Sequence, residues 1–246
     1  MLIALIADIH ANMLALRACL DRVTALRAEK IVFLGDLVGY GAEPEETVKT
    51  IRSLHESGAT VIRGNHDQAA FSARDDMNET ARLAIQWTRA NLSDAAKNYL
   101  ASLPMTAEEN GCLYVHAEAS APASWKYVTG PVEARASLAA TRAAITFCGH
   151  VHVPALYCVS ATGKLTAHTP TTDVAVPTGI HRQWLAVIGS AGQPRDGNPA
   201  AAFATYDTAE RILTFRRVSY DAESAAARVR DAGLPDVLAQ RLLRGR

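Results

Sequence analysis

Five histidines of this chain lie in short motifs that also hold a carboxylate, an amide or a second histidine. In chain order the motifs are Asp8-Ile9-His10, Gly35-Asp36, Gly64-Asn65-His66-Asp67, Val115-His116 and Gly149-His150-Val151-His152. Oxygen and imidazole groups are ligands for divalent transition metals, and this number of them suits two ions better than one. The residue types therefore predict metal-assisted hydrolysis.

The chemistry of each ligand indicates how two ions could be held. Asp36 follows a glycine, which lets the chain turn tightly, and its two carboxylate oxygens can bridge two ions. Asn65 adds a neutral oxygen, and His150 and His152 can reach neighbouring ions if the segment between them is bent. Two ions about 3.5–4 Å apart can clamp a phosphate and supply a bridging hydroxide for in-line attack. No Ser or Cys nucleophile is then required.

His66 and Asp67 form a second kind of candidate. His66 adjoins Asn65 and cannot easily share its ion, whereas Asp67 could hold the His66 ring in one tautomer and raise its basicity. We expect His66 to act as a general acid that protonates the leaving oxygen. The alternative is that His66 stabilises charge on the phosphoryl oxygens in the transition state.

Candidates for substrate contacts each have a simpler alternative role. Asn12 suits a helix cap first, Tyr40 is equally an exposed turn residue, and Arg195 is either a bidentate phosphate ligand or a loop-tethering ion pair. Trp125 and Tyr127 either line a substrate wall or pack in the core. His55, His168 and His181 fall outside the motifs, and we expect them to play no part in the chemistry.

The elements that must position these residues are read from apolar segments. Short strands are expected at 2–7, 31–34, 60–62, 113–116 and 145–148, and each ends at a motif. Ligands of α/β proteins bind beyond the carboxyl ends of strands, so the motifs should converge there. Helices are expected from Asn12 to about Arg27, from Pro44 to near Gly58, and over most of 68–102, with Leu83, Ile85 and Trp87 in the core.

After His152 the pattern becomes β, with strands expected at 155–159, 165–167, 184–188, 203–206 and 212–218. A helical tail should run from about 222, with a break at Gly233-Leu234-Pro235. No repeat or linker interrupts the chain, so residues 1–246 are predicted to form one domain.

Composition narrows the class of protein. Lys+Arg and Asp+Glu are both 25, so the basic excess of a nucleic-acid binder is missing. The four cysteines are scattered without a Cys-x-x-Cys pair, which argues against a zinc knot or a disulfide framework and favours a reducing cytoplasm. The apolar segment at residues 1–7 is interrupted by Asp8 and is too short for a signal peptide or a membrane span. The sequence leaves the oligomeric state open.

Three segments carry a resemblance to a known family: Asp8-Ile9-His10-Ala11-Asn12, the stretch from Gly35 to Gly41, and the stretch from Gly189 to Gly197. Over about residues 1–218 the order of motifs resembles the calcineurin-like metallophosphoesterase superfamily, most closely its small bacterial and archaeal branch. The resemblance implies an α/β fold, a four-layer αββα sandwich of two mixed sheets flanked by helices.

The resemblance also implies a distribution of ligands over two divalent ions, whose identity among Mn, Fe, Zn, Ni and Co the sequence leaves open. One ion would be held by Asp8, His10, Asp36 and His152, and the other by Asp36, Asn65, His116 and His150. His66 would be the acid near the site and Asp67 its partner.

Two positions depart from the family pattern. The fourth motif is often His-Gly-Ser-Pro, whereas here it is His116-Ala117-Glu118-Ala119, so Glu118 is expected to bring an added carboxylate near the metals that disfavours anionic substrates. Val187 stands where the family often has Asn, so a polar contact should be missing there. Neither change touches an expected ligand.

The function expected from these observations is metal-dependent hydrolysis of a small phosphate ester, most plausibly a phosphodiester or a nucleotide-type substrate. A phosphomonoesterase or protein-phosphatase-like activity is the alternative within enzymes. A non-catalytic scaffold of the same fold, which binds proteins with its surface, is the alternative of another class. Loss of His66 or of a ligand would favour the scaffold, and this chain has lost neither.

Overall fold

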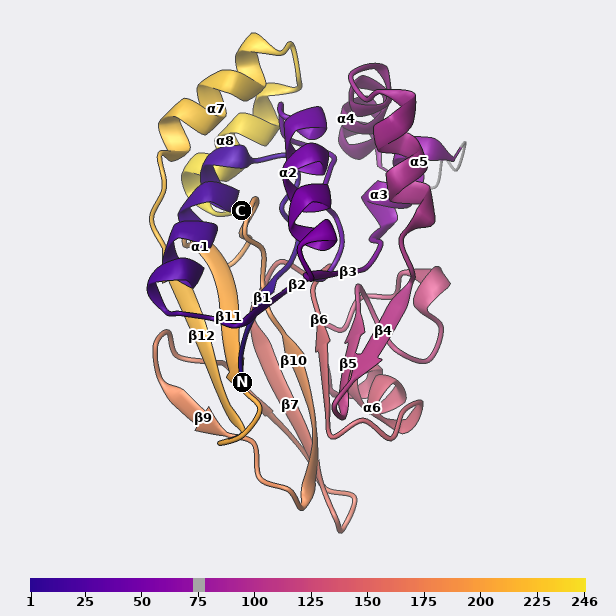
Figure 1. The fold of residues 1–246 in the computed structure, drawn as a ribbon, viewed down its shortest axis with the longest axis vertical. Coiled ribbons are helices and arrows are strands. Elements are labelled where there is room, and N and C mark those ends of the chain that lie inside the picture. Colours follow the sequence, from indigo (N-terminus) through magenta and orange to yellow (C-terminus); the bar gives the residue numbers. More distant parts are fainter. Residues whose placement is uncertain (73–77) are drawn as a thin grey trace.

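The computed structural model describes residues 1–72 and 78–246, and its strands form two mixed six-stranded sheets (Figure 1). The first sheet has the order β3 (Thr60–Val61), β2 (Lys30–Phe33), β1 (Leu2–Ile6), β11 (Ala201–Asp207), β12 (Ile212–Val218) and β9 (Ala175–Pro177). The second has the order β4 (Thr106–Glu109), β5 (Cys112–Val115), β6 (Ile145–Cys148), β10 (Arg182–Val187), β7 (Ala155–Ser160) and β8 (Leu165–His168). In each sheet the strands that end at the motifs run parallel, namely β1, β2 and β3 in one, and β5 and β6 in the other.

The two-residue period of the strands divides the apolar side chains between layers. In β1, Ile3 and Leu5 pack between the sheets, while Ala4 and Ile6 face the other way, toward helices. In the second sheet Phe147 lies between the sheets, and its neighbour Cys148 lies on the outer face. The result is the expected four-layer αββα sandwich, with one apolar layer between the sheets and one under each helical layer.

The helices cover both outer faces. They are α1 (Met13–Ala25), α2 (Pro44–Glu56), α3 (Asn65–Phe71), α4 (Glu79–Ala90), α5 (Asp94–Ser102), α6 (Pro131–Ala139), α7 (Ala222–Asp231) and α8 (Asp236–Arg244), with a short 3₁₀ helix η1 (Pro122–Ser124). Helices α1, α2, α3 and α5 supply the core over the first sheet, and α6 packs on the second. The predicted starts are confirmed: the Asn12 side chain caps α1, and Pro44 begins α2.

One expected core residue is wrong. The apolar stripe of α4 runs through Ala81, Ala84 and Ile85, and Leu83 points to the opposite side of the helix and is 42% exposed. Ile85 is buried as predicted, and Trp87 is partly buried against the C-terminal helices. Residues 73–77, inside the stretch expected to be mostly helical, lie outside the described part of the chain.

The expected helical tail is a pair of helices, α7 and α8, separated at the predicted break and packed against the rest of the chain (Figure 1). Buried residues of the pair, including Val229, Leu238 and Leu242, form one cluster with Ala84 and Tyr40. Arg228 of α7 also forms an ion pair with Glu43. The pair therefore supports the loop that carries Tyr40. None of the helices in the described ranges is both long and apolar enough to cross a membrane.

Candidate metal centre

The five motifs converge at the carboxyl ends of β1, β2, β3, β5 and β6, as the strand pattern predicts. The first two motif loops are joined by backbone hydrogen bonds from Asp8 N to Gly35 O at 3.1 Å and from His10 N to Asp36 O at 3.0 Å. Every expected ligand is buried except Asn65, which is partly exposed. The sheets thus bring together side chains separated by up to 144 residues of sequence.

The loops reach this arrangement through unusual backbone geometry. Left-handed conformations with φ between 49° and 66° occur at five of the expected ligands, Asp8, His10, Asp36, His150 and His152. Such conformations are uncommon for residues other than glycine and cluster at functional sites when the surrounding structure holds them. Here they turn successive side chains of each motif toward the same point.

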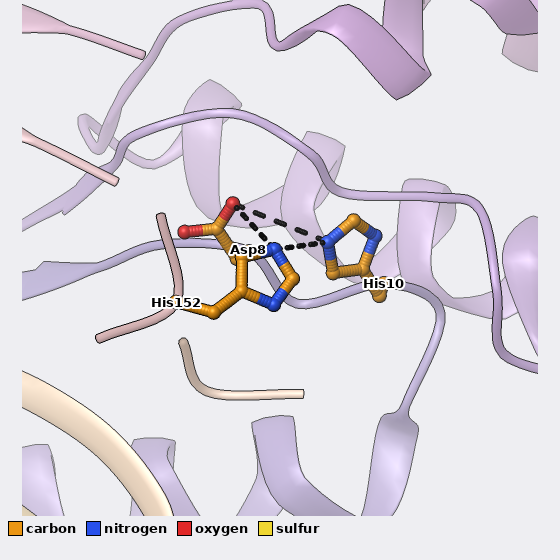
Figure 2. A group of neighbouring side chains, drawn as sticks. All are labelled: Asp8, His10 and His152. Carbon is orange, nitrogen blue, oxygen red and sulfur yellow. Dashed lines mark hydrogen bonds and ion pairs between the residues drawn. The ribbon is translucent and has the colours of Figure 1, made fainter. Parts of the chain in front are cut away.

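The histidines meet in two pairs with ring nitrogens facing each other. Nε2 of His10 lies 3.1 Å from Nε2 of His152, and Nε2 of His116 lies 3.2 Å from Nδ1 of His150. The carboxylate of Asp8 lies beside the first pair, with its Oδ1 3.4 Å from His152 Nε2 (Figure 2). The carboxylate of Asp36 lies beside the second, with its Oδ2 3.4 Å from His116 Nε2.

In each ring, the outer nitrogen faces away from the partner ring and the inner nitrogen faces it. The hydrogen bond of the outer nitrogen determines whether the inner nitrogen of a neutral ring carries a proton. Carbonyl oxygens of Val38, Gln193, Leu34 and Trp125 lie at 2.6–3.2 Å from the outer nitrogens of His10, His152, His116 and His150, respectively. A carbonyl only accepts, so each outer nitrogen carries the proton, and the inner nitrogen of a neutral ring presents a lone pair. Two lone pairs about 3 Å apart repel each other unless a cation lies between them.

Two ligand groups follow from this geometry. Asp8, His10 and His152 offer donor atoms within 4.8 Å of one another, and so do Asp36, His116 and His150. Asp36 also approaches the first group, with Oδ2 at 3.7 Å from His10 Nε2, and Asn65 Oδ1 lies 3.2 Å from His116 Nε2. The donors therefore fit two divalent ions, with Asp36 between them.

The protonation states of the expected ligands also suit the binding of metal ions. Burial and the nearby His116 lower the pKa of His150 to about 3, and burial lowers the pKa of His10 well below its usual value. Burial opposes protonation of His116 too, but the adjacent Asp36 carboxylate outweighs it and raises the pKa of His116 to about 9. His10 and His150 are thus neutral donors, and the proton on His116 stands where a metal ion would compete with it.

His66 lies at the same centre but is not held by Asp67. The Asp67 carboxylate accepts hydrogen bonds from the backbone N–H groups of Leu37, Val38 and Gly64, at 2.8–3.2 Å. The expected pairing with the His66 ring is therefore replaced by a tie between two motif loops. Nδ1 of His66 is buried and has no hydrogen-bond partner among the residues that the structure describes.

His66 also forms a possible third ligand group with His10 and Asp36, whose donor atoms lie within 4.8 Å of one another. Its backbone N–H donates to Asp36 Oδ1 at 2.8 Å. Its ring borders the cleft beside the metal ligands. The geometry thus places His66 close to both the ligands and the space where a substrate would bind.

The three residues expected to contact the substrate differ in whether they border the site and whether their polar groups already have hydrogen-bond partners. Asn12 uses both ends of its amide, because Oδ1 accepts from Ala15 N at 3.1 Å and Nδ2 donates to Gly192 O at 2.9 Å. Tyr40 is 8% exposed rather than an exposed turn residue, and its ring lies 4.4 Å from that of His66. Asn12 is therefore a structural residue, whereas Tyr40 borders the site.

Arg195 is the cationic side chain beside these rings. Its guanidinium lies over the Tyr40 ring at 5.7 Å, and one of its nitrogens donates to Gln193 Oε1 at 2.9 Å. Its Nε is buried with no hydrogen-bond partner within residues 1–72 and 78–246, and no ion pair is formed with a carboxylate in those ranges. A loop-tethering ion pair, the alternative role, is thus not what the described structure shows.

The two departures from the family pattern have structural explanations. Both carboxylate oxygens of Glu118 accept hydrogen bonds from Ser120 and Ala121 at 2.7–2.9 Å, so this carboxylate caps its own loop and does not join the metal ligands as expected. Val187 is fully buried at the end of β10, in the apolar cluster over the second sheet.

A cleft of about 240 Å³ lies beside the centre. Its lining combines site residues with side chains from α3, α4 and the loop after β5, namely Tyr40, Asn65, His66, Gln68, Ala69, Ser72, Asn78, Ala81, Ser124, Trp125, Tyr127 and His150. The sequence identifies the aromatic members as candidates only, because nothing in their spacing distinguishes a cleft wall from a core.

The fold and the convergent side chains are those expected of the metallophosphoesterase family, and comparison with known proteins agrees. The sequence model of the calcineurin-like phosphoesterase superfamily domain matches residues 1–211, and the chain belongs to this family. It is similar to the uncharacterized protein MJ0912 of Methanocaldococcus jannaschii, with 32% identity over 100% of this chain and 98% of the relative.

Solved structures extend the comparison to the whole fold. A metallophosphoesterase from Sphaerobacter thermophilus is similar with a TM-score of 0.87 and 33% identity, covering 100% of this chain and 99% of that one. The hypothetical protein PH1004 from Pyrococcus horikoshii OT3 shares the fold with a TM-score of 0.79 and 20% identity, covering 100% and 98% of the two chains. Both similarities include α7 and α8, which follow the region matched by the family model.

Proposed function

We propose that this protein is a phosphodiesterase that uses two divalent metal ions to hydrolyse a small, nucleotide-type phosphate ester. The observation that carries the proposal is the double histidine pair. Each pair brings two inner ring nitrogens together beside a buried carboxylate, and each outer ring nitrogen is held by a backbone carbonyl. This is the arrangement by which proteins orient histidine ligands toward a metal.

Asp8, His10, Asp36 and His152 would hold one ion, and Asp36, Asn65, His116 and His150 the other. When bound, such ions polarise a phosphoryl oxygen and supply a hydroxide nucleophile at neutral pH. Mn, Fe, Zn, Ni and Co are all compatible with these donors.

The remaining residues would either contact the substrate or hold the loops of the site in place. His66, which borders the cleft, would donate a hydrogen bond or a proton to an ester oxygen. Arg195, whose guanidinium lies over the Tyr40 ring, would contact a phosphoryl oxygen through a charge-assisted hydrogen bond, and Tyr40 would hold the guanidinium in place. Asp67 would keep the two loops that carry Asp36 and His66 in register.

The cleft supports a diester over a monoester. A monoester has one substituent on phosphorus and needs one space beside the metals, whereas a diester needs two. The cleft of about 240 Å³ provides room for an ester group in addition to the one that leaves. All four cysteines are free and buried, which suits the reducing cytoplasm that we propose as the location.

The test is turnover by purified protein loaded with Mn²⁺, measured with bis(p-nitrophenyl) phosphate and with p-nitrophenyl phosphate. We expect faster turnover of the diester. Faster turnover of the monoester would favour the phosphomonoesterase alternative. No turnover of either substrate with any of the five metals would overturn the proposed activity and leave the scaffold.

Two variants separate metal binding from catalysis. Asp36→Asn should lower both the bound metal and the turnover, because Asp36 lies between the two groups of donors. His66→Ala should slow turnover by about 100-fold to 10,000-fold while metal stays bound, if His66 acts as an acid. Loss of metal in His66→Ala would instead assign His66 to the third ligand group.

A further inference from the structure

The loop after β5 carries two aromatic residues to the proposed metal centre whose side chains have no role in the function proposed above. Trp125 and Tyr127 both line the cleft. The Tyr127 ring stacks on the ring of His150, with centroids 4.0 Å apart and planes inclined by 18°, yet Tyr127 is 51% exposed. The Trp125 ring meets His116 edge-on, with centroids 5.8 Å apart. We refer to Trp125 and Tyr127 as the aromatic wall.

The backbone under the aromatic wall is held in place. Trp125 has a left-handed conformation, with φ 53° and ψ 37°, which is unfavourable for a bulky residue. Its carbonyl accepts a hydrogen bond from His150 Nε2 at 2.9 Å. At the start of the loop, Glu118 accepts from the backbone N–H groups of Ser120 and Ala121. The backbone from Ser120 to Trp125 is therefore tied down at both ends.

The rest of the cleft lining, within the described part of the chain, is mostly polar and uncharged. Gln68, Ser72 and Asn78 lie in the lining, and no Lys or Arg is found among its described residues. The Ser72 hydroxyl oxygen is buried and has no hydrogen-bond partner in the described part of the chain. The lining suits a neutral, planar group with hydrogen-bonding edges.

We infer that the cleft binds the base of a nucleoside phosphate ester, stacked against the aromatic wall with its polar edge toward Gln68, Ser72 and Asn78. This inference rests on the proposed function, because the metal ions would hold the phosphate. Aromatic side chains bind bases by stacking with little dependence on base identity. At about 240 Å³ the cleft is smaller than the pockets of about 300–1,000 Å³ that hold drug-sized ligands, which suits one nucleoside better than a peptide segment.

The test compares adenosine 5′-monophosphate with ribose 5-phosphate, which differ only in the base. Equilibrium binding to the Mn²⁺-loaded protein is measured by calorimetry, with phosphate release followed in the same samples. We expect the nucleotide to bind at least about tenfold more tightly, since stacking on an aromatic side chain contributes about that factor or more. Tyr127→Ala should remove most of this difference, and Tyr127→Phe, which keeps the ring, should preserve it.

Two results would overturn the inference. One is equal affinity of the two ligands for the unchanged protein. The other is a Tyr127→Ala variant that weakens both ligands equally, since Tyr127 would then act only by holding His150. Inorganic phosphate serves as the reference for the metal centre itself. If phosphate binds to the Mn²⁺-loaded protein but the base does not increase the affinity, only the base subsite is refuted. If phosphate does not bind either, the proposed function is refuted as well.

Discussion

Gly64 offers a sharp test of how closely the metal centre is packed. This residue is the N-cap of α3, just before Asn65, and its backbone is extended, with φ −100° and ψ 179°, so any residue could adopt its conformation. A Cβ atom at this position would lie 2.2 Å from Asp36 Oδ1 and 2.3 Å from Asp36 N. Gly64→Ala therefore adds one methyl group against Asp36 without adding backbone strain.

The size of the effect follows from that contact. An ordinary carbon–oxygen separation is about 3.3 Å, so the Asp36 carboxylate would have to move by about 1 Å. A misplacement of about 1 Å in a catalytic centre costs on the order of 100-fold in rate, or about 2.7 kcal/mol. Overpacking of the site should also cost about 1–3 kcal/mol of stability, which lowers Tm by about 2–12 °C in a chain of this size.

The assay measures kcat/KM with bis(p-nitrophenyl) phosphate, metal content by mass spectrometry and Tm by circular dichroism. Gly179→Ala is the matched control, because a Cβ atom at Gly179 has nothing within 4 Å. We expect the control to stay within about 0.5 kcal/mol of the original stability and to keep its activity. A Gly64→Ala protein with full metal content, unchanged Tm and activity within threefold would refute the close packing of Asp36.

Three further predictions concern metal binding and the C-terminal helices. Removing the metals with a chelator should lower Tm. Adding Mn²⁺ at 100 times its dissociation constant should raise the free energy of unfolding by about 2.7 kcal/mol and Tm by about 5–11 °C. A Tm that does not depend on metal would contradict the two sites. Because the pKa of His116 is raised to about 9, its proton is present below that pH and must leave when metal binds. Metal affinity, measured by calorimetry, should therefore rise about tenfold from pH 7 to pH 8, and a constant affinity would exclude this competition. Leu242→Ala should cost about 2–5 kcal/mol, seen as a lower Tm, because Leu242 is buried with Tyr40; no change in Tm would show that α8 is a loosely attached tail.

The convergence of the expected ligands could be predicted because they carry their chemistry in their residue types. Asp8, Asp36 and His116 each follow an apolar segment, and a strand that ends at a polar motif places that motif at the edge of a sheet. Of the four strands at the sheet edges, β3 and β8 could be predicted, whereas β4 and β9 could not. β4 is the polar segment Thr106–Glu109, and β9 has only three residues, so neither shows the apolar alternation that identifies a strand.

The groups that orient the ligands could not be predicted. The four histidine rings are held by carbonyl oxygens of Val38, Gln193, Leu34 and Trp125. Every residue has a backbone carbonyl, so its use as a hydrogen-bond acceptor leaves no trace in residue type. For the same reason, residue types do not reveal the hydrogen bonds of Asp67 to three backbone N–H groups. They point instead to a pairing of Asp67 with its sequence neighbour His66.

Glu118 shows how a departure from the family pattern can change function without touching a ligand. By charge alone, a carboxylate two residues after His116 should repel an anionic substrate. Instead, its oxygens accept hydrogen bonds from Ser120 and Ala121, and they hold the start of the loop that brings Trp125 and Tyr127 to the cleft. In the proposed function, the ligands on the strand ends cannot vary without loss of metal, whereas none of the side chains between Ser120 and Tyr127 is an expected ligand. Differences in substrate between this protein and its relatives should therefore arise in the loop between β5 and α6.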